Sequence, residues 1–115
     1  MYQLTLTEKQ VEVLGSALDL YSRIGIGQLE AIEWLYRYVN CVEFGKLDDL
    51  REKLAAAKIA LGHSPNGSYS IYNENVNDRF RIAFDLEKVI CHQRLDGEIP
   101  NQSGSEPLAV IQKIG

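Results

Sequence analysis

Residues 7–24 have the sequence TEKQVEVLGSALDLYSRI, and this stretch decides the fold because it predicts a long amphipathic helix. Thr7 and Gln10 have the spacing of a capping box, in which two side chains bind free backbone amides at a helix start. We expect the helix over residues 8–24, with apolar side chains three and four residues apart along one stripe. Those side chains are Val11, Leu14, Leu18 and Tyr21.

Three more segments with helical periodicity follow, over about 28–40, 47–61 and 77–95. Gly25 and Gly27 separate the first helix from the second, and each weakens a helix by about 1 kcal/mol relative to alanine. We therefore expect a kink or a tight turn between these helices. The last helix is apolar around most of its circumference, which predicts that it lies at the centre of the domain.

The second and third helices each have a predicted apolar inner face. The residues of these faces are Leu29, Ile32, Tyr36 and Val39 in the second helix, and Leu47, Leu50, Leu54, Ala57 and Leu61 in the third. Trp34 and Tyr38 lie on another side of the second helix, where they offer aromatic surface to a partner chain.

Short strands are predicted at both ends of the chain. Residues 2–6, YQLTL, alternate apolar and polar side chains, and residues 108–114, LAVIQKI, can form a second strand. The two can pair within one chain or between chains. Because an isolated two-stranded ribbon is only marginally stable, it must pack on helices or extend across a dimer. The sequence therefore predicts a mainly α, single four-helix domain over residues 1–115, with residues 96–115 packed or exchanged in a homo-oligomer.

The composition argues against several classes of protein. The formal net charge is −4, whereas nucleic-acid binders usually carry an excess of Lys and Arg, so we expect no nucleic-acid partner. No apolar run approaches the roughly 20 residues that span a bilayer, and the N-terminus lacks the pattern of a signal peptide. We therefore expect a cytoplasmic protein without a membrane partner. Cys41 and Cys91 are expected to be free thiols, and the isolated His63 and His92 predict no metal site or cofactor.

A polar stripe on the last predicted helix is the most informative feature of the sequence. Arg81, Asp85, Lys88 and His92 are four, three and four residues apart, which places them within about 60° of one another around the helix. One interpretation is a solvated face with Arg81–Asp85 and Asp85–Lys88 pairs. The other is an anion site, in which Arg81 donates a fork of hydrogen bonds and His92 adds a pH-sensitive donor.

Two further segments can contribute to a ligand site. Residues 62–77 form a long polar linker, and its hydroxyl-rich part with Ser68 and Tyr69 can bind a sugar and stack on a base. The sequence YSRIGIGQ places Arg23 and Gln28 beside a turn at a helix start, where free amides can receive an anion. Each segment also has a structural interpretation, the first as a loop that plugs the core edge and the second as a helix break.

Patterns that predict catalysis are weak. Glu30 and Glu33 lie on one helical face, as in all-helical nucleotide pyrophosphohydrolases that hold magnesium, but that chemistry needs a second acidic pair on a neighbouring helix. Asp85 and Glu87 are two residues apart and do not face the same way. Neither a Gly-x-Ser-x-Gly nor a His-Glu-x-x-His motif occurs. We therefore expect a binding protein rather than an enzyme.

Several motifs resemble a family of small phage and prophage proteins, most of them without an assigned function. The motifs are ALDLYSRI followed by GQ within residues 17–28, SYSI at 68–71, and VICH at 89–92. The family pattern favours glycine at the position of Ser70 and arginine at that of Cys91, so this chain lacks one positive group next to His92. The resemblance spans roughly residues 4–95 and implies a phage origin.

Phage proteins of this size include inhibitors of host defence, and some sequester cyclic nucleotides or cyclic ADP-ribose-type signals as oligomers. With this resemblance, the polar segments predict an anti-defence protein that binds a nucleotide-derived immune signal without turnover. Its expected ligand contacts are Arg23, Gln28, Ser68, Tyr69, Arg81 and His92. The alternative is a protein-interaction module that inhibits or regulates a host or phage protein through Trp34, Tyr38 and residues 97–115. A DNA-binding regulator and the magnesium-dependent pyrophosphohydrolase are smaller alternatives.

Overall fold

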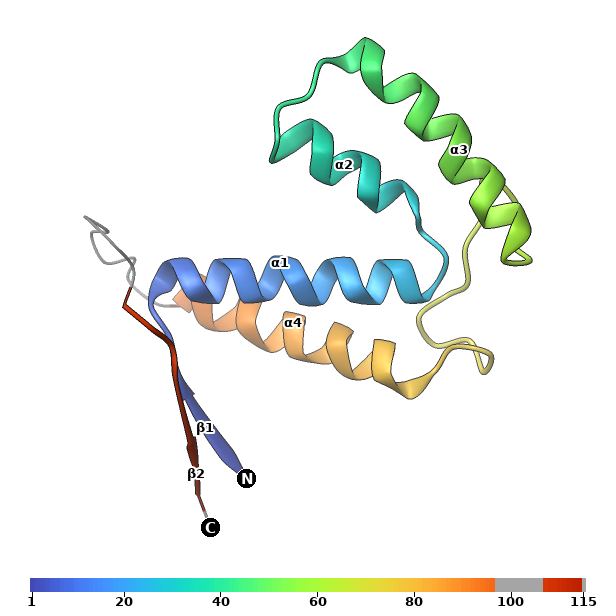
Figure 1. Cartoon of the computed structure of the whole chain (residues 1–115). Helices are drawn as coiled ribbons and strands as arrows, with labels where there is room; N and C mark the ends of the chain where they lie inside the picture. Colours follow the sequence, from blue (N-terminus) through green and yellow to red (C-terminus); the bar gives the residue numbers. More distant parts are fainter. Residues whose placement is uncertain (97–106, 115) are drawn as a thin grey trace.

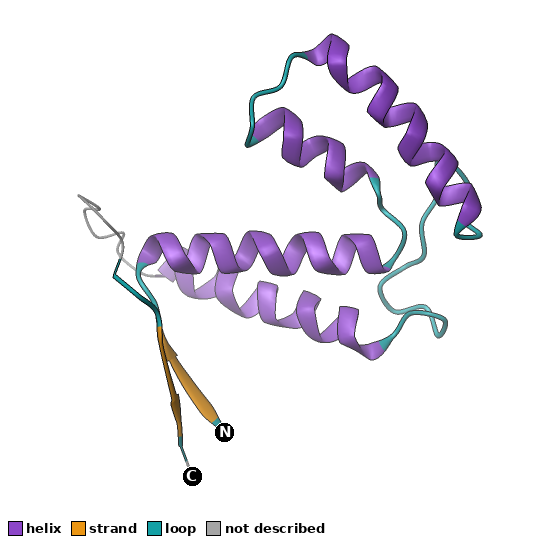
Figure 2. Ribbon diagram, in the orientation of Figure 1, coloured by secondary structure: helices purple, strands orange, loops and turns teal. Residues whose placement is uncertain are grey.

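The computed structural model describes residues 1–96 and 107–114, apart from the side chains of Phe44 and of residues 92–96. Its elements are β1 (Tyr2–Thr5), α1 (Glu8–Gly25), α2 (Glu30–Tyr38), the short 3-10 helix η1 (Phe44–Lys46), α3 (Leu47–Ala60), α4 (Asp78–Asp96) and β2 (Val110–Lys113). The helices form two pairs, α1 with α4 and α2 with α3, and the strands project from the first pair as a ribbon (Figure 1, Figure 2). The prediction of a mainly α chain with short terminal strands is confirmed. None of the described helices is long and apolar enough to cross a membrane.

Glycines let α1 and α4 pack closely side by side. A Cβ atom added to Gly15 would lie 3.6 Å from Cγ2 of Ile90, and one added to Gly25 would overlap the ring of Phe80. The first half of α1 thus faces the second half of α4, and the end of α1 faces the start of α4, so the two helices run antiparallel (Figure 1). Tyr21 extends this contact, because the centre of its ring lies 5.0 Å from that of Phe80.

Local interactions set both ends of α1. The predicted capping box is present: the Thr7 hydroxyl accepts from the Gln10 amide at 3.2 Å, and the Gln10 side chain accepts from the Thr7 amide at 2.9 Å. After the helix, Gly27 has a φ of +94°, which residues with a side chain rarely adopt. The chain therefore turns sharply before α2, as predicted. The Ile26 carbonyl accepts from the Tyr69 amide at 2.9 Å, which fixes the α3–α4 loop over this turn.

Charged side chains make up much of the contact between α2 and α3. Lys58 of α3 has only 1% of its side chain exposed and forms an ion pair with Glu30 of α2. Glu33 of α2 is also buried and accepts hydrogen bonds from Arg37 and, at 2.9 Å, from Arg51 of α3. The hydrogen bond to Glu33 raises the pKa of Arg51. These pairs are needed because a buried ion without a partner costs several kcal/mol of desolvation.

The predicted inner faces of α2 and α3 are partly wrong. Tyr36, Val39 and Leu61 were expected in the core, but all three are exposed. Tyr36 lies in the last turn of α2, and Val39 and Leu61 are the residues that follow their helices, where no described element covers them. The exposure predicted for Trp34 and Tyr38 is confirmed.

The expectation that α4 is the central helix is also wrong. Ala83 is buried, but Ile82, Leu86 and Val89 are exposed. In Figure 1, α4 lies against α1 on one side and has no described helix on the other. Its apolar circumference therefore leaves a stripe of apolar side chains on the surface.

The strands pair antiparallel within one chain, in a register that places Tyr2 opposite Lys113. The N–H of Ile114 continues the pairing by donating to the Met1 carbonyl at 2.8 Å. Every residue of both strands is exposed, and the ribbon points away from the helices (Figure 1). The ribbon thus forms in its own chain but does not pack on that chain's helices. Residues 97–106 of the predicted tail lie outside the described residues.

Candidate functional site

A hollow of about 200 Å³ lies where the end of α1, the turn after it, the α3–α4 loop and the middle of α4 meet. Its wall combines two cations, a carboxylate, a hydroxyl, an amide, an aromatic ring and two aliphatic side chains. The lining residues are Asp19, Ser22, Arg23, Ile26, Gln28, Ile71, Phe84 and Lys88. Apolar walls with a few convergent polar groups are typical of small-molecule sites.

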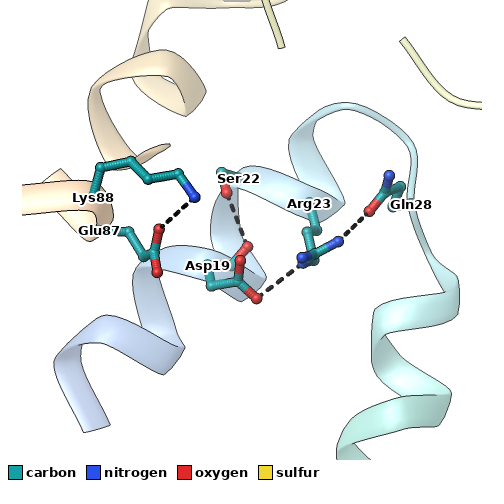
Figure 3. A network of polar contacts seen from close by, with 6 residues as sticks. All are labelled: Asp19, Ser22, Arg23, Gln28, Glu87 and Lys88. Atoms are coloured by element: carbon teal, nitrogen blue, oxygen red, sulfur yellow. Dashed lines mark hydrogen bonds and ion pairs between the residues drawn. The ribbon is translucent and has the colours of Figure 1, made fainter. Parts of the chain in front are cut away.

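Arg23 is the better-oriented cation of the hollow. Its Nε donates to the Asp19 carboxylate at 2.9 Å, and its Nη1 donates to Oε1 of Gln28 at 2.8 Å (Figure 3). The backbone amide of Gln28 donates to the Arg23 carbonyl at 2.9 Å, so the turn itself brings the two side chains together. The guanidinium carbon also lies 5.5 Å from the ring centre of Trp34. These contacts hold the guanidinium plane in one orientation.

Lys88 is the second cation and comes from α4. Its Nζ lies 4.9 Å from the centre of the Phe84 ring. The same nitrogen lies 3.6 Å from a carboxylate oxygen of Glu87 (Figure 3). The Lys88 side chain is 60% exposed, and at 3.6 Å its nitrogen is beyond hydrogen-bond distance of the Glu87 carboxylate. Lys88 can therefore turn toward a ligand, whereas Arg23 is already oriented.

The hollow brings together Arg23 and Gln28 of the six predicted contact residues. Arg81 is not among its lining residues. The Nη1 of Arg81 donates to the Asn73 carbonyl at 3.0 Å, and its Nη2 pairs with Asp78. Arg81 thus ties the start of α4 to the preceding loop.

The polar stripe of α4 divides between two environments. Lys88 lines the hollow, whereas Asp85 is exposed on the outer side of the helix. The predicted pair of Asp85 with Lys88 is replaced by the contact of Lys88 with Glu87, and the predicted Arg81–Asp85 pair is replaced as described above. These differences arise because nearby residues that are not in the stripe offer closer partners. The side chain of His92 lies outside the described residues.

Ser68 and Tyr69 are not among the lining residues of the hollow either. Ser68 is exposed on the α3–α4 loop, while the Tyr69 ring packs edge-on against His63 with the ring centres 5.0 Å apart. From this loop, Ile71 reaches the hollow. The ring and the backbone amide of Tyr69 therefore both anchor the loop.

Sequence reasoning missed Asp19, Ser22 and Phe84 as lining residues. Asp19 precedes Arg23 by four residues in a helix, and that spacing alone predicts their ion pair. Ser22 is buried and donates its hydroxyl to the Asp19 carbonyl at 2.9 Å, a local bond that no motif reveals. The apolar pattern places Phe84 in the core and does not show that its ring borders a cavity.

The acidic pair that suggested a magnesium site has another role. Glu30 and Glu33 are bound by cationic side chains of α2 and α3. Among the described residues, no three His, Cys, Asp or Glu side chains gather closely enough to hold a metal ion. Cys41 and Cys91 are exposed free thiols, as expected. The side chains that line the hollow offer hydrogen bonds, charge and an aromatic face to a ligand.

Figure 3 shows that α1, the turn after it and α4 each contribute side chains to the hollow. Arg23 and Gln28 are preorganised by the turn after α1, and Lys88 of α4 lies across from them. Comparison of the chain with models of protein families, with curated proteins and with solved structures gives no match.

Proposed function

We propose that this is a phage-encoded anti-defence protein that binds a nucleotide-derived immune signal, of the cyclic nucleotide or cyclic ADP-ribose type, and sequesters it without turnover. The observation that supports this function is the hollow, in which Arg23, Gln28 and Lys88 surround a space beside an aromatic ring. Guanidinium and ammonium groups bind phosphate, and a side-chain amide binds the edge of a base. The phage origin is inferred from the motif resemblance at residues 17–28, 68–71 and 89–92.

The size of the hollow limits how much of the ligand it encloses. Pockets that enclose drug-sized ligands have volumes of about 300–1,000 Å³, whereas the hollow has about 200 Å³. One base, or one phosphate with its ribose, can enter, and the rest of the ligand must extend outside. Trp34 is partly exposed next to Arg23 and offers a ring on which that remainder can stack.

The charges around the hollow favour a nucleotide over a bare phosphate. Arg23 pairs with Asp19, and Lys88 lies near Glu87, so a phosphate must compete with a carboxylate at each cation. A ligand that also donates hydrogen bonds to these carboxylates offsets that competition. Ribose hydroxyls and base amino groups are such donors. We therefore expect inorganic phosphate to bind weakly.

Isothermal titration against cyclic mononucleotides, cyclic dinucleotides and cyclic forms of ADP-ribose tests the proposal. We expect heat with at least one member of the panel and recovery of the unchanged ligand after the protein is denatured. Absence of heat with every member excludes nucleotide capture. Chemical conversion of a bound ligand excludes sequestration without turnover.

Variants of the two cations locate the site. A hydrogen bond to a charged group contributes about 1.5–3 kcal/mol, so Arg23→Ala and Lys88→Ala should each weaken binding by roughly 10- to 100-fold. Arg79→Ala is the matched control, because Arg79 is an exposed cation of α4 that does not line the hollow. Equal affinities of the three variants would place the ligand elsewhere.

A protein-interaction module is the second candidate, and the aromatic surface of α2 favours it. Trp34, Tyr36 and Tyr38 are all exposed, and tyrosine and tryptophan are enriched in protein interfaces. A double variant, Tyr36→Ser with Tyr38→Ser, separates the two functions because neither residue lines the hollow. Nucleotide capture predicts that it binds ligand normally. The interaction module predicts that it loses a stoichiometric partner that wild-type protein recovers from host lysate.

A further inference from the structure

α4 has an apolar stripe that no described part of the chain covers. Ile82, Leu86 and Val89 are four and three residues apart, which places them on one face of the helix, and all three are exposed. Asp85 lies on the same face and is also exposed. This outer face of α4 therefore combines three apolar side chains with one carboxylate.

The ribbon of β1 and β2 has a face of matching composition. Residues directly opposite each other in paired strands lie on the same side of the sheet, and so do alternate residues along one strand. The register therefore places Tyr2, Leu4, Ile111 and Lys113 together. All of them are exposed, Ile111 by 67%. This apolar face of the ribbon combines three apolar side chains with one ammonium group.

The two faces agree in length and are opposite in charge. Residues 82–89 of a helix span about 10 Å, and four residues of a strand also span about 10 Å. Lys113 and Asp85 supply one positive and one negative group at the edges of otherwise apolar surfaces. In its own chain the ribbon points away from α4 and stays exposed, so the two faces do not meet there (Figure 1).

The surface area of the chain shows how much a second copy would have to cover. A compact monomer of 13.0 kDa has an accessible surface of about 6,300 Å², and this chain has 8664 Å². Subtracting all the surface that residues 97–106 and 115 would have as unfolded chain still leaves an excess of about 800 Å². Standard interfaces bury about 800 Å² per partner. The excess is therefore large enough for a stable dimer.

The radius of gyration also indicates that a single chain is less compact than a typical domain. The radius of gyration is 17.0 Å, whereas a compact domain of this length has about 13 Å. An isolated two-stranded ribbon is also only marginally stable in water. A single chain is therefore more extended than a compact domain, and its ribbon has no packing partner that the structure describes. A second copy could supply that partner.

We propose that the ribbon of one chain lies on the outer face of α4 of a second copy, with Lys113 of one copy next to Asp85 of the other, and that two copies exchange ribbons reciprocally. A two-fold axis makes every contact twice, so both ribbons and both α4 stripes are covered together. Neither face contains a residue of the hollow, so this inference does not depend on the proposed ligand.

Charge reversal tests the contact. Asp85→Lys places two ammonium groups together, and Lys113→Asp places two carboxylates together, so each variant should dimerise about tenfold or more weakly than wild type. A mixture of the two variants should form a heterodimer of near wild-type affinity. One of its interfaces keeps the original pair, and the other has the pair with exchanged signs. Rescue of this kind requires contact between different chains.

Native mass spectrometry and size-exclusion chromatography with light scattering give the readout, and circular dichroism confirms that each variant is folded. Glu52→Lys is the control, since it reverses an exposed charge on α3, outside both faces, and should dimerise as wild type does. Leu86→Ser should weaken the dimer without any change of charge. The proposal is overturned by a wild-type monomer across the micromolar range, by a dimer that tolerates both charge reversals, or by a mixture without rescue.

Discussion

Replacing Gly25 with alanine should destabilise the protein, although alanine is the better helix former. Gly25 is the last residue of α1, and an added Cβ would overlap the ring of Phe80 on α4. The ring would have to withdraw to an ordinary contact distance of about 3.5–4.0 Å, which disturbs its packing against Tyr21. Overpacking costs about 1–3 kcal/mol and the aromatic contact contributes about 0.5–1.5 kcal/mol, while alanine returns about 1 kcal/mol of helix propensity. The expected net loss in the free energy of unfolding is about 0.5–3.5 kcal/mol.

Urea denaturation followed by circular dichroism measures this loss, with Gly15→Ala as the matched control. Gly15 lies inside α1, and its new Cβ would meet Ile90 at an ordinary contact distance of 3.6 Å. That variant should gain about 0.5–1 kcal/mol, because alanine has less backbone entropy to lose. Phe80→Leu should recover part of the loss in the Gly25→Ala background. If the two glycine variants were equally stable, the close approach of α1 and α4 at Gly25 would be refuted.

Three further predictions concern stability. In thermal unfolding, Gly27→Ala should have a lower midpoint temperature than Gly62→Ala. Both glycines have a positive φ, which costs alanine about 1–2 kcal/mol, but only at Gly27 would the new Cβ lie 2.7 Å from a histidine ring. Glu30→Leu should lower the free energy of unfolding, measured by urea titration, by about 3 kcal/mol because it leaves buried Lys58 unpaired. Adding Lys58→Met should restore most of that free energy. A double variant as unstable as Glu30→Leu would contradict the pairing. Arg81→Ala removes the hydrogen bond to the Asn73 carbonyl and should lower the free energy of unfolding by about 1 kcal/mol, with ligand affinity unchanged. Weaker ligand binding in calorimetry would show that Arg81 contacts the ligand.

The sequence predicts the elements well because their determinants are local. The capping box at Thr7 and the glycine at position 27 act within a few residues, and both ends of α1 lie where these signals place them. Burial depends instead on partners far along the chain. A lysine is normally exposed, yet Lys58 is buried because Glu30 of another helix pairs with it. Leu61 fits the apolar stripe of α3 but lies past its end, where no described helix covers it.

In the candidate site, too, the sequence predicts the contacts that depend on local residues but not those that depend on distant ones. Arg23 and Gln28 come together because one tight turn joins them, which the Gly-x-Gly pattern indicates. Lys88 reaches the same hollow from the polar stripe of α4. Arg81 belongs to that stripe too, but its guanidinium binds the Asn73 carbonyl, and a backbone acceptor in a loop leaves no trace in side-chain patterns.

The order in which contacts become available follows from the pairing of α1 with α4. α2 and α3 are neighbours in sequence and can associate early, whereas α1 must wait for a helix made much later, and Thr5 has no strand partner until Val110 emerges from the ribosome. Until then the apolar side of α1 is bare, a condition that attracts chaperones and proteases. A translation product that stops before Lys88 would therefore leave part of the apolar side of α1 uncovered.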